Sequence, residues 1–386
     1  MLLSVLLLIG FSAGTIMGVA VGQVTLTVSA ASGTINPGDP CPVPRNGAIY
    51  KTIQKAINCA EPSDAINVAS GSYAEDLIIP ANKTSLQLVG ISATIKGVQN
   101  VPEASFPLAA PNIEVLANGV SIHHFTIDGP DYTAGRYSSG MVIGAQNVNI
   151  FSNQFRVTPA ATAGEISQAI QTYHVLAVPG VDISGLNIHD NTFTHLSAGA
   201  AGYEGIWVNL DAGSGGITID DNDFTGNIVR AITTERSNTV ISNNLIRTDL
   251  SPGAPGSGAW QGINIGGANS GAIANVLLSG NTVEGSSGFD QGIKLGYAGT
   301  STFSAVTISG NSIADSNIGI WFKFSASGVT VQQNDIVGNA VGVDNDDLVN
   351  TANAESNWWG CNAGPSNPAC DTVSGPVDFD PWLTSS

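Results

Sequence analysis

Short runs in which apolar residues alternate with other residues recur along the middle of the chain. They are GMVIG at 140–144, AIQTY at 169–173, GIWVN at 205–209, AITTE at 231–235, GINIG at 262–266, GIKLG at 292–296, GIWFK at 319–323 and GVDND at 342–346. A period of two is typical of a β-strand that buries one face. In GIWVN, Ile206 and Val208 are therefore expected to point inward, and Trp207 and Asn209 to point outward.

A second phrase alternates with these runs and has asparagine at its fourth position. Its copies are IFSNQF at 150–155, IHDNTF at 188–193, IDDNDF at 219–224, ISNNLI at 241–246, LSGNTV at 278–283, ISGNSI at 308–313 and VQQNDI at 331–336. Asn222 and Asn244 are 22 residues apart, a spacing typical of one coil in a stack of parallel coils. Each asparagine is expected at a turn, in the left-handed backbone conformation, with its amide in a ladder of hydrogen bonds.

The two ends of the chain differ from the repeats. The entry segment, IYKTIQKAINCAEPSDAINVASGSYAEDLIIP at 49–80, resembles the first coil of pectin-lyase-like right-handed β-helix proteins. The exit segment, NWWGCNAGPSNPACDTVSGPVDFDPWL at 357–383, resembles the C-terminal cap of many β-helix repeat proteins. The resemblance covers about residues 45–383, and it leaves the activity open because the superfamily includes lyases, hydrolases, epimerases, adhesins and maturation factors.

The resemblance implies an all-β fold, a single-stranded right-handed parallel β-helix (solenoid) of about ten coils. It also implies an N-terminal capping helix at about 51–60 and a C-terminal cap. The expected division is an apolar segment at 1–22, an N-terminal extension at 23–44, the β-helix at 45–356 and the cap at 357–386.

The apolar segment at the start of the chain has two interpretations. Residues 2–22 carry no charge, which is typical of a secretory signal peptide, although no Lys or Arg precedes the apolar run. The alternative is that the segment is retained as an anchor or assembly helix, in which case the protein could self-associate.

Charge and composition exclude several classes of protein. The chain has 12 Lys and Arg against 30 Asp and Glu, a net charge of −18, so neither nucleic acid nor an anionic membrane surface is an expected partner. Apolar residues make up 42%, which excludes a disordered chain. The 46 glycines suit a fold with many tight turns.

Four cysteines fall into two local pairs, Cys41 with Cys59 and Cys361 with Cys370. Nearest-neighbour pairing is favoured among the three connectivities that four cysteines allow, because each pair lies in its own end segment. Disulfides indicate an oxidising compartment. Together with the apolar start, they predict an extracellular or cell-surface protein.

The outward positions of the alternating runs predict one exposed column of side chains. They are Gln171, Tyr173, Trp207, Asn209, Thr233, Glu235, Asn264, Lys294, Trp321, Lys323, Asp344 and Asp346, with Glu204, Asp211, Arg230 and Asp290 at the edges. Insertions flank these runs on successive coils, so the column is expected to form the floor of a groove. Exposed aromatic faces suit sugar rings, and the predicted partner is a polysaccharide or a cell-surface glycan.

The column contains residue types that could act on a polysaccharide. The predicted catalytic residues are Glu235, Lys294, Glu204 and Asp211, and the predicted substrate-binding residues are Trp207, Trp321, Tyr173, Asn209, Asn264, Lys323 and Arg230. An inverting hydrolase would need two carboxylates about 6.5–9.5 Å apart. Glu235 with Glu204 or Asp211 could supply them. A lyase would need a base beside a charge neutraliser, which Lys294 or Lys323 with Arg230 could supply.

Metal ligands are not evident in the sequence, and no cofactor is expected to be required. His123 and His124 are adjacent, so they are expected to point to opposite faces of a strand and to make a poor metal pair. His189 and His195 have no familiar ligand spacing. The acidic runs at 220–223 and 344–347 could hold Ca²⁺, although neither matches a calcium loop. Copper is unsupported, because only three Met are present and two lie in residues 1–22.

Two functions are therefore open. The first is an extracellular protein that binds, and as a lyase or glycoside hydrolase would process, a polysaccharide along the exposed groove. The second is a non-catalytic structural protein of the cell surface, an adhesin or filament subunit. Since no diagnostic lyase, hydrolase or epimerase motif is visible, the sequence leaves catalysis open.

Overall fold

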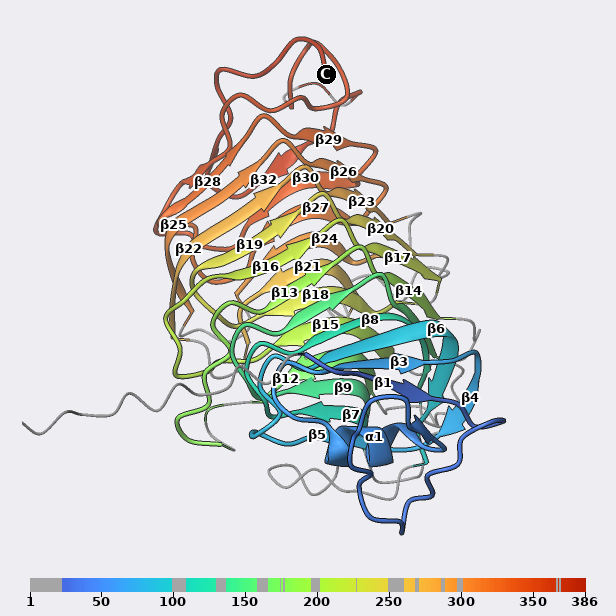
Figure 1. Ribbon diagram of the computed structural model, residues 1–386. Helices are drawn as coiled ribbons and strands as arrows, with labels where there is room; N and C mark the ends of the chain where they lie inside the picture. The colour runs from blue at the N-terminus through green and yellow to red at the C-terminus, as the bar shows by residue number, and fades with distance from the viewer. Residues whose placement is uncertain are drawn as a thin grey trace, which may run out of the picture.

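The protein forms one elongated stack of β-strands, seen along its length in Figure 1. Its structure is a computed structural model that describes residues 23–98, 109–129, 137–157, 166–173, 175, 178–195, 202–226, 228–248, 260–267, 271–285, 289–296, 301–365, 367 and 369–386. The chain rises through the stack coil by coil, from the first strands and α1 at one end to the C-terminal segment at the other (Figure 1). Residues 1–22, with their two interpretations, lie outside the described residues.

One face of the stack is an 11-stranded sheet, here called sheet B. Its strands are β5 (Leu77–Ile79), β7 (Ala109–Val115), β9 (Tyr137–Ile143), β12 (Ile166–Thr172), β15 (Gly202–Val208), β18 (Arg230–Thr234), β21 (Gln261–Ile265), β24 (Gln291–Leu295), β27 (Ile318–Phe322), β30 (Val341–Asn345) and β32 (Val373–Ser374). Successive strands pair in parallel, so each coil contributes one strand to this face. The alternating runs of the sequence are the strands of sheet B.

The other faces form a 22-stranded sheet, here called sheet A, which bends around the stack. Its strands are β1 (Thr25–Val28), β2 (Ile49–Tyr50), β3 (Ala65–Val68), β4 (Gly71–Ala74), β6 (Gln87–Lys96), β8 (Ser121–Asp128), β10 (Asn149–Phe151), β11 (Gln154–Val157), β13 (Asn187–His189), β14 (Thr192–His195), β16 (Ile217–Asp220), β17 (Asp223–Gly226), β19 (Thr239–Ser242), β20 (Leu245–Arg247), β22 (Ala272–Ser279), β23 (Thr282–Glu284), β25 (Thr302–Ser309), β26 (Ser312–Ala314), β28 (Val329–Gln332), β29 (Asp335–Val337), β31 (Ala352–Asn353) and β33 (Val377–Asp378). The long strands β6 and β8 continue through the bend. Each of them pairs with two shorter strands, one on each side of the bend.

The core runs through the centre of the stack and is built from equivalent residues of successive coils. Ile206, Ile232, Ile263, Ile293 and Ile320 are in register across sheet B, and each is at most 1% exposed. Phenylalanines stack in the same way beneath sheet A: the ring centroids of Phe155 and Phe193 are 4.9 Å apart, and those of Phe193 and Phe224 are 4.5 Å apart. The inward register predicted from the alternation is therefore confirmed.

A continuous ladder of buried asparagines marks the bend in sheet A. The rungs are Asn153, Asn191, Asn222, Asn244, Asn281, Asn311, Asn334 and Asn357. The Nδ2 of each donates to the Oδ1 of the next at 2.9–3.1 Å. The amide is suited to this position because it carries a donor and an acceptor, and both are used. The predicted ladder is confirmed, and it continues one coil further, to Asn357.

The left-handed conformation belongs to the residue before each asparagine and not, as expected, to the asparagine itself. Ser152, Asp190, Asp221 and Asn243 have φ between 50° and 54°, and Gly280 and Gly310 occupy the same position in later coils. The turn is therefore made one residue earlier. The asparagine side chain is then free to point into the ladder.

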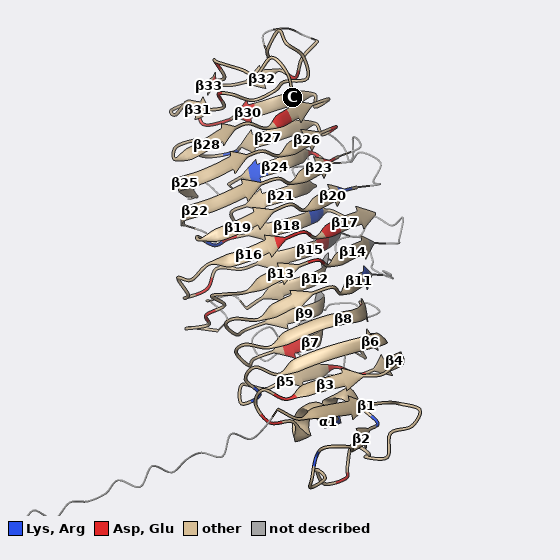
Figure 2. Ribbon diagram, turned by 45° about the horizontal axis from the view of Figure 1, so that its top comes forward, with Lys and Arg blue, Asp and Glu red and all other residues tan. Residues whose placement is uncertain are grey.

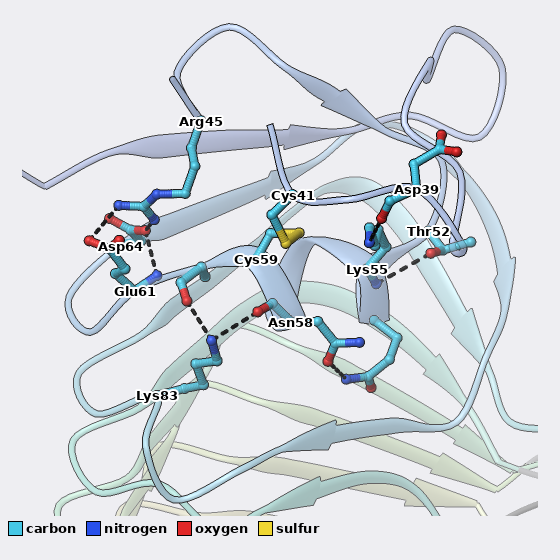
Figure 3. The surroundings of a disulfide bond; sticks show 12 residues. Asp39, Cys41, Arg45, Thr52, Lys55, Asn58, Cys59, Glu61, Asp64 and Lys83 are labelled. Atoms are coloured by element: carbon cyan, nitrogen blue, oxygen red, sulfur yellow. Dashed lines mark hydrogen bonds and ion pairs between the residues drawn. A yellow bond between two sulfur atoms is a disulfide. The ribbon is translucent and has the colours of Figure 1, made fainter. Parts of the chain in front are cut away.

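The N-terminal end of the stack carries the short helix α1 (Ile53–Cys59), within the range expected for a capping helix. Thr52 begins it, because its side chain accepts a hydrogen bond from the Lys55 amide at 3.3 Å. Figure 3 shows the Cys41–Cys59 disulfide joining the last residue of α1 to the preceding segment. The strand β1, inside the segment expected to be an extension, pairs with β3 of the first coil.

Charged side chains support the same end of the stack. Arg45 forms ion pairs with Glu61, at 2.7 Å, and with Asp64. The Lys83 amine donates to the carbonyl oxygens of Asn58 and Ala60, close to the last turn of α1 (Figure 3). At the other end of the chain a second disulfide joins Cys361 to Cys370, so both predicted pairings are confirmed. Among the described residues, no helix has the length and hydropathy needed to cross a membrane.

Candidate functional site

The outer face of sheet B carries the column predicted from the alternating runs. Gln171, Trp207, Thr233, Asn264, Lys294, Trp321 and Asp344 are in register on seven successive strands. Each follows a buried Ile or Val in sequence, so alternation along the strand turns it away from the core. Figure 2 shows charged positions on several strands of this sheet, among them β15, β18, β24 and β30.

The column is not uniformly exposed, contrary to expectation. Trp207 and Trp321 are partly exposed, but Thr233, Asn264 and Lys294 between them are each only 2% exposed. Alternation sets the direction of a side chain and not its contact with solvent. Coils stack about 4.8 Å apart, so a large neighbour such as Trp321 shields the smaller residue on the next rung.

Lys294 is the most perturbed group in the column. Burial, with the nearby cations Lys323 and Arg230, lowers its pKa to about 8, although the Asp290 carboxylate opposes the change. The Nζ of Lys294 lies 5.5 Å from the centre of the Trp321 ring, and that of Lys323 lies 5.2 Å from it. The Trp321 indole N–H donates to Asp346 at 3.0 Å. The three residues form an aromatic platform flanked by two cations.

A second outward column, which we did not predict, runs beside the first. It contains Gln168, Glu204, Arg230, Gln261 and Gln291 in register. Each stands three residues before a member of the first column, and the two positions between them point inward. At Gly205 a Cβ would lie 2.5 Å from the ring of Phe224 in the core, which shows why glycine is needed there. In the sequence, each member of this second column is a polar residue that is followed by Gly or Ala and then by Ile. This pattern is the signal from which the column could have been predicted.

Glu204 and Arg230 form a buried ion pair in this second column. Arg230 also donates to Gln261 at 3.1 Å, and Gln168 donates to Glu204 at 3.2 Å. Burial raises the pKa of Glu204, although Arg230 opposes the change. The Glu204 carboxylate, which we expected to act as an acid or base, is therefore held by the Arg230 cation and the Gln168 amide.

The other two candidate carboxylates lie beyond the opposite end of the strands. Glu235 is 3% exposed and follows β18, and its amide donates to the carbonyl of Val208 at 2.9 Å. Burial raises the pKa of Glu235, while a hydrogen bond from Trp207 opposes the change. Asp211 forms a buried ion pair with Arg236 at 2.8 Å. Val208 comes four positions after Glu204, about 13 Å along a strand. Since the Glu235 amide bonds Val208, Glu204 and Glu235 are not adjacent.

Two of the predicted binding residues serve the structure of the coil. Tyr173 is 4% exposed, and its hydroxyl donates to the Glu114 carboxylate. Asn209 is 9% exposed, and its Nδ2 donates to the carbonyl of Thr172 at 2.6 Å. The expectation that both face solvent is wrong, because each residue follows the end of its strand, where the chain turns and the side chain packs on the neighbouring coil.

Much of the predicted groove wall lies outside the described residues. The insertions at 158–167, 196–204, 250–260, 284–291, 266–275 and 296–305 each contain such positions. In the part of the chain that the structure describes, no group of three or more His, Cys, Asp or Glu is placed to hold a metal ion. In the acidic runs at 220–223 and 344–347, carboxylates already accept hydrogen bonds from the protein. Asp220 accepts one from the Asn243 side chain at 3.0 Å, and Asp347 accepts from the backbone amides of Ala326 and Val349.

The stacked parallel coils and the two long parallel sheets define a right-handed parallel β-helix protein. A family described as "Periplasmic copper-binding protein (NosD)" matches residues 147–362. This is more than half of the chain, and the chain belongs to the NosD family. A search of curated protein sequences finds no match.

Several solved structures are similar to this chain. An exopolygalacturonase from Thermotoga maritima has a TM-score of 0.45 and 11% identity over 76% of this chain and 74% of its own. A family 28 exopolygalacturonase from Yersinia enterocolitica has a TM-score of 0.45 and 15% identity over 94% and 77%. The mannuronan C-5 epimerase A-module from Azotobacter vinelandii has a TM-score of 0.40 and 13% identity over 86% and 95%. Identities this low transfer no activity.

Residues 147–362, the range that the family model matches, contain no evident set of ligands for the copper named in the family description. Residues 147–362 contain no Met, and their single cysteine, Cys361, is in a disulfide. Of the three histidines in that range, the ring nitrogens of His189 are hydrogen-bonded to Asp190 and Asn149. His174 and the side chain of His195 lie outside the described residues. No chemical step at sheet B is therefore assigned to copper.

Proposed function

We propose that the outer face of sheet B binds an extracellular polysaccharide that carries anionic groups. The observation that supports this most strongly is the Trp321 ring between Lys294 and Lys323, with Arg230 close enough to affect the pKa of Lys294. These are three of the 12 cations of a chain with a net charge of −18. Such local clustering of cations is what an acidic protein needs in order to hold a polyanion.

Hydrogen-bonding groups between the two tryptophans support a polar ligand. The Oγ1 of Thr233 and the Oδ1 of Asn264 are buried and have no hydrogen-bond partner among the described residues. Buried polar atoms are normally satisfied, and sugar hydroxyl groups are suitable partners. Trp207 and Trp321 would then stack on sugar rings at either end of this segment, and the lysines would neutralise carboxylate or sulfate groups.

If the site is catalytic, its residues favour a lyase over a hydrolase. Glu204 and Asp211 are each held by an arginine, whereas Lys294 has a pKa of about 8. In β-elimination the neutral amine would take the proton from the carbon that bears a uronate carboxylate. A C=C bond would form, the glycosidic C–O bond at the neighbouring carbon would break, and the leaving oxygen would take up a proton. Lys323, the second cation beside the Trp321 ring, would neutralise the carboxylate.

A non-catalytic role as an adhesin or filament subunit of the cell surface is the alternative. The disulfides suit an oxidising compartment, and the family is described as periplasmic, so we place the protein outside the cytoplasm. The two roles differ in the expected product. A surface protein would bind a glycan or another subunit and leave it intact, whereas a lyase would release unsaturated oligosaccharides.

The test is a glycan array followed by a product assay. The wild-type protein should bind an acidic polysaccharide, and Trp321→Ala and Trp207→Ala should each weaken binding by about tenfold or more, the loss of about 1.4 kcal/mol. Phe151→Ala, on the outer face of sheet A, is the matched control and should bind normally. Assays for reducing ends and unsaturated products then separate a lyase from a binding protein. Unchanged binding by both tryptophan variants would contradict the proposed site.

A further inference from the structure

The first column of sheet B changes the sign of its charge at the end nearest the C-terminus. Lys294, Trp321 and Asp344 occupy the same position on the successive strands β24, β27 and β30. Asp346 follows β30, and its carboxylate accepts the Trp321 indole N–H at 3.0 Å. Figure 2 shows the basic position on β24 and the acidic position on β30, with β27 between these strands in the sheet. The Trp321 ring therefore has a cation in the coil before it and two carboxylates in the coil after it.

Lys323, in the same coil as Trp321, is held between two aromatic rings. Its Nζ lies 5.2 Å from the centre of the Trp321 ring and 5.2 Å from that of the Phe324 ring. Phe324 is 38% exposed, and Trp321 and Lys323 are partly exposed, so a ligand can reach all three. A sugar unit that stacks on the Trp321 ring can direct an anionic group toward the Lys323 ammonium.

The carboxylates of the next coil have the opposite effect on an anionic chain. Asp346 is exposed and Asp344 is partly exposed. Coils stack about 4.8 Å apart, so an anionic unit one coil beyond Trp321 would lie beside both carboxylates. Like charges in such contact oppose binding and exclude a wrong ligand or a wrong register. A polyanion can therefore occupy the column up to Trp321 but not past it.

We propose that Asp344 and Asp346 close the binding column at this end, so that sheet B holds an acidic polysaccharide by one end of its chain and not by an interior stretch. The inference rests on the proposed function, and it adds which part of the polymer is recognised and in which direction the polymer lies. The anionic end unit lies at Trp321, beside Lys323. The rest of the chain extends coil by coil toward Trp207 on β15.

The segment between the two tryptophans sets the length of the recognised end. Trp207 and Trp321 are in register across β15, β18, β21, β24 and β27, a distance of about 19 Å at the spacing of stacked coils. A pyranose unit in an extended chain is about as long as one coil step, so the segment accommodates about five units. Units beyond these lie past Trp207, outside the segment that the tryptophans bound.

The experiment measures how affinity depends on chain length. The probes are pentamers and decamers of galacturonate, which carry carboxylates, and carrageenan oligosaccharides of matched length, which carry sulfates. Binding is measured at fixed ionic strength with EDTA present, so that no divalent cation bridges ligand and protein. Because each chain has one suitable end, the wild type should bind pentamers and decamers equally per chain. A column open at both ends would accept a decamer in about six registers and bind it about sixfold more tightly.

Asp344→Asn with Asp346→Asn removes both charges and keeps an amide oxygen that accepts the Trp321 indole N–H. Decamers should then bind at least about threefold more tightly than pentamers, because interior stretches no longer meet a like charge. Asp335→Asn with Asp378→Asn is the matched control. It removes the same charge from β29 and β33 of sheet A, and it should leave the two affinities equal. Circular dichroism and thermal unfolding confirm that each variant is folded.

The possible failures separate this inference from the proposed function. A wild type that prefers decamers by the factor expected for an open column would overturn the inference and leave the polysaccharide site in place. Equal affinities in the Asp344→Asn, Asp346→Asn protein, or a change of the same size in the control, would show that these carboxylates do not set the boundary. A wild type that binds neither polyanion would contradict the proposed function and this inference together.

Discussion

Lys294 is a cation held almost entirely away from water on the outer face of a sheet. Its ammonium group interacts with the Trp321 ring and with the Asp290 carboxylate, but burial and two nearby cations outweigh them and lower its pKa to about 8. A group in this state destabilises the folded protein while it is charged. Proteins keep such groups most often where they are used, which is why we place Lys294 at the centre of the proposed site.

Replacing Lys294 with methionine should therefore stabilise the protein near neutral pH. The pKa falls from 10.5 to about 8 on folding, so the unfolded chain binds more protons between these values, and the wild type gains stability as pH rises through that interval. Lys294→Met removes this dependence. After allowance for solvent screening, the variant should be more stable by about 1 kcal/mol below pH 8 and equal to the wild type near pH 10.5.

Urea unfolding of both proteins at pH 7 and near pH 10.5 measures the difference. Lys323→Met, which changes the more exposed lysine beside the same ring, should alter stability by less than about 0.5 kcal/mol. A variant that is less stable than the wild type at pH 7 would mean that the interactions of Lys294 outweigh its desolvation.

At the scale of elements, the asparagine ladder connects the coils at the bend of sheet A. Each interior rung donates to the next asparagine and accepts from the previous one, and it also bonds backbone carbonyls of adjacent strands. For Asn281 these partners are Asn244, Asn311 and the carbonyl of Ile241. Since the amides are buried, removing one leaves its neighbours without partners in a dry environment.

Asn281→Ala should lower the free energy of unfolding by about 2–4 kcal/mol, because two neighbouring amides and one carbonyl lose their partner. Asn243→Gly is the matched control. It changes an exposed asparagine in the adjacent turn that already has φ +53°, where glycine is favoured, so its effect should be small. Chemical denaturation measures both. A loss of stability in Asn281→Ala no larger than that in the control would show that the ladder contributes little.

At the scale of the whole molecule, the solenoid has two ends at which the core would otherwise meet water. The N-terminal end is covered by α1 and tied by the Cys41–Cys59 disulfide. The C-terminal end carries the Cys361–Cys370 disulfide and the buried Trp359. In a linear stack each coil contacts only its neighbours, so opening is expected to begin at an end and spread inward.

Cys41→Ser with Cys59→Ser should therefore weaken the N-terminal coils before the rest. The bond closes a loop of 18 residues, and loops of this size contribute about 3 kcal/mol by restricting the unfolded chain. Hydrogen exchange should accelerate first in β1 and β3 and leave the central strands β18 and β21 protected. Uniform acceleration along the stack would contradict unfolding from the end.

The fold could be predicted from the sequence because a repeating coil uses the same local pattern many times. Alternation identified the inward isoleucines, the asparagine phrase identified the ladder, and the local cysteine pairs identified both disulfides. Each of these depends on residues that are close in sequence or that repeat at a regular interval. The direction of every side chain in the first column of sheet B was determined in the same way.

Solvent exposure and the pairing of charges were decided only by the tertiary structure. Alternation places Lys294 on the outer face, but whether water reaches it depends on the rings and coils packed around it. Glu204 meets Arg230 because their strands are adjacent, although 26 positions separate them in the chain. His123 and His124 meet because a single residue takes the left-handed conformation, which reverses the alternation that the sequence predicts.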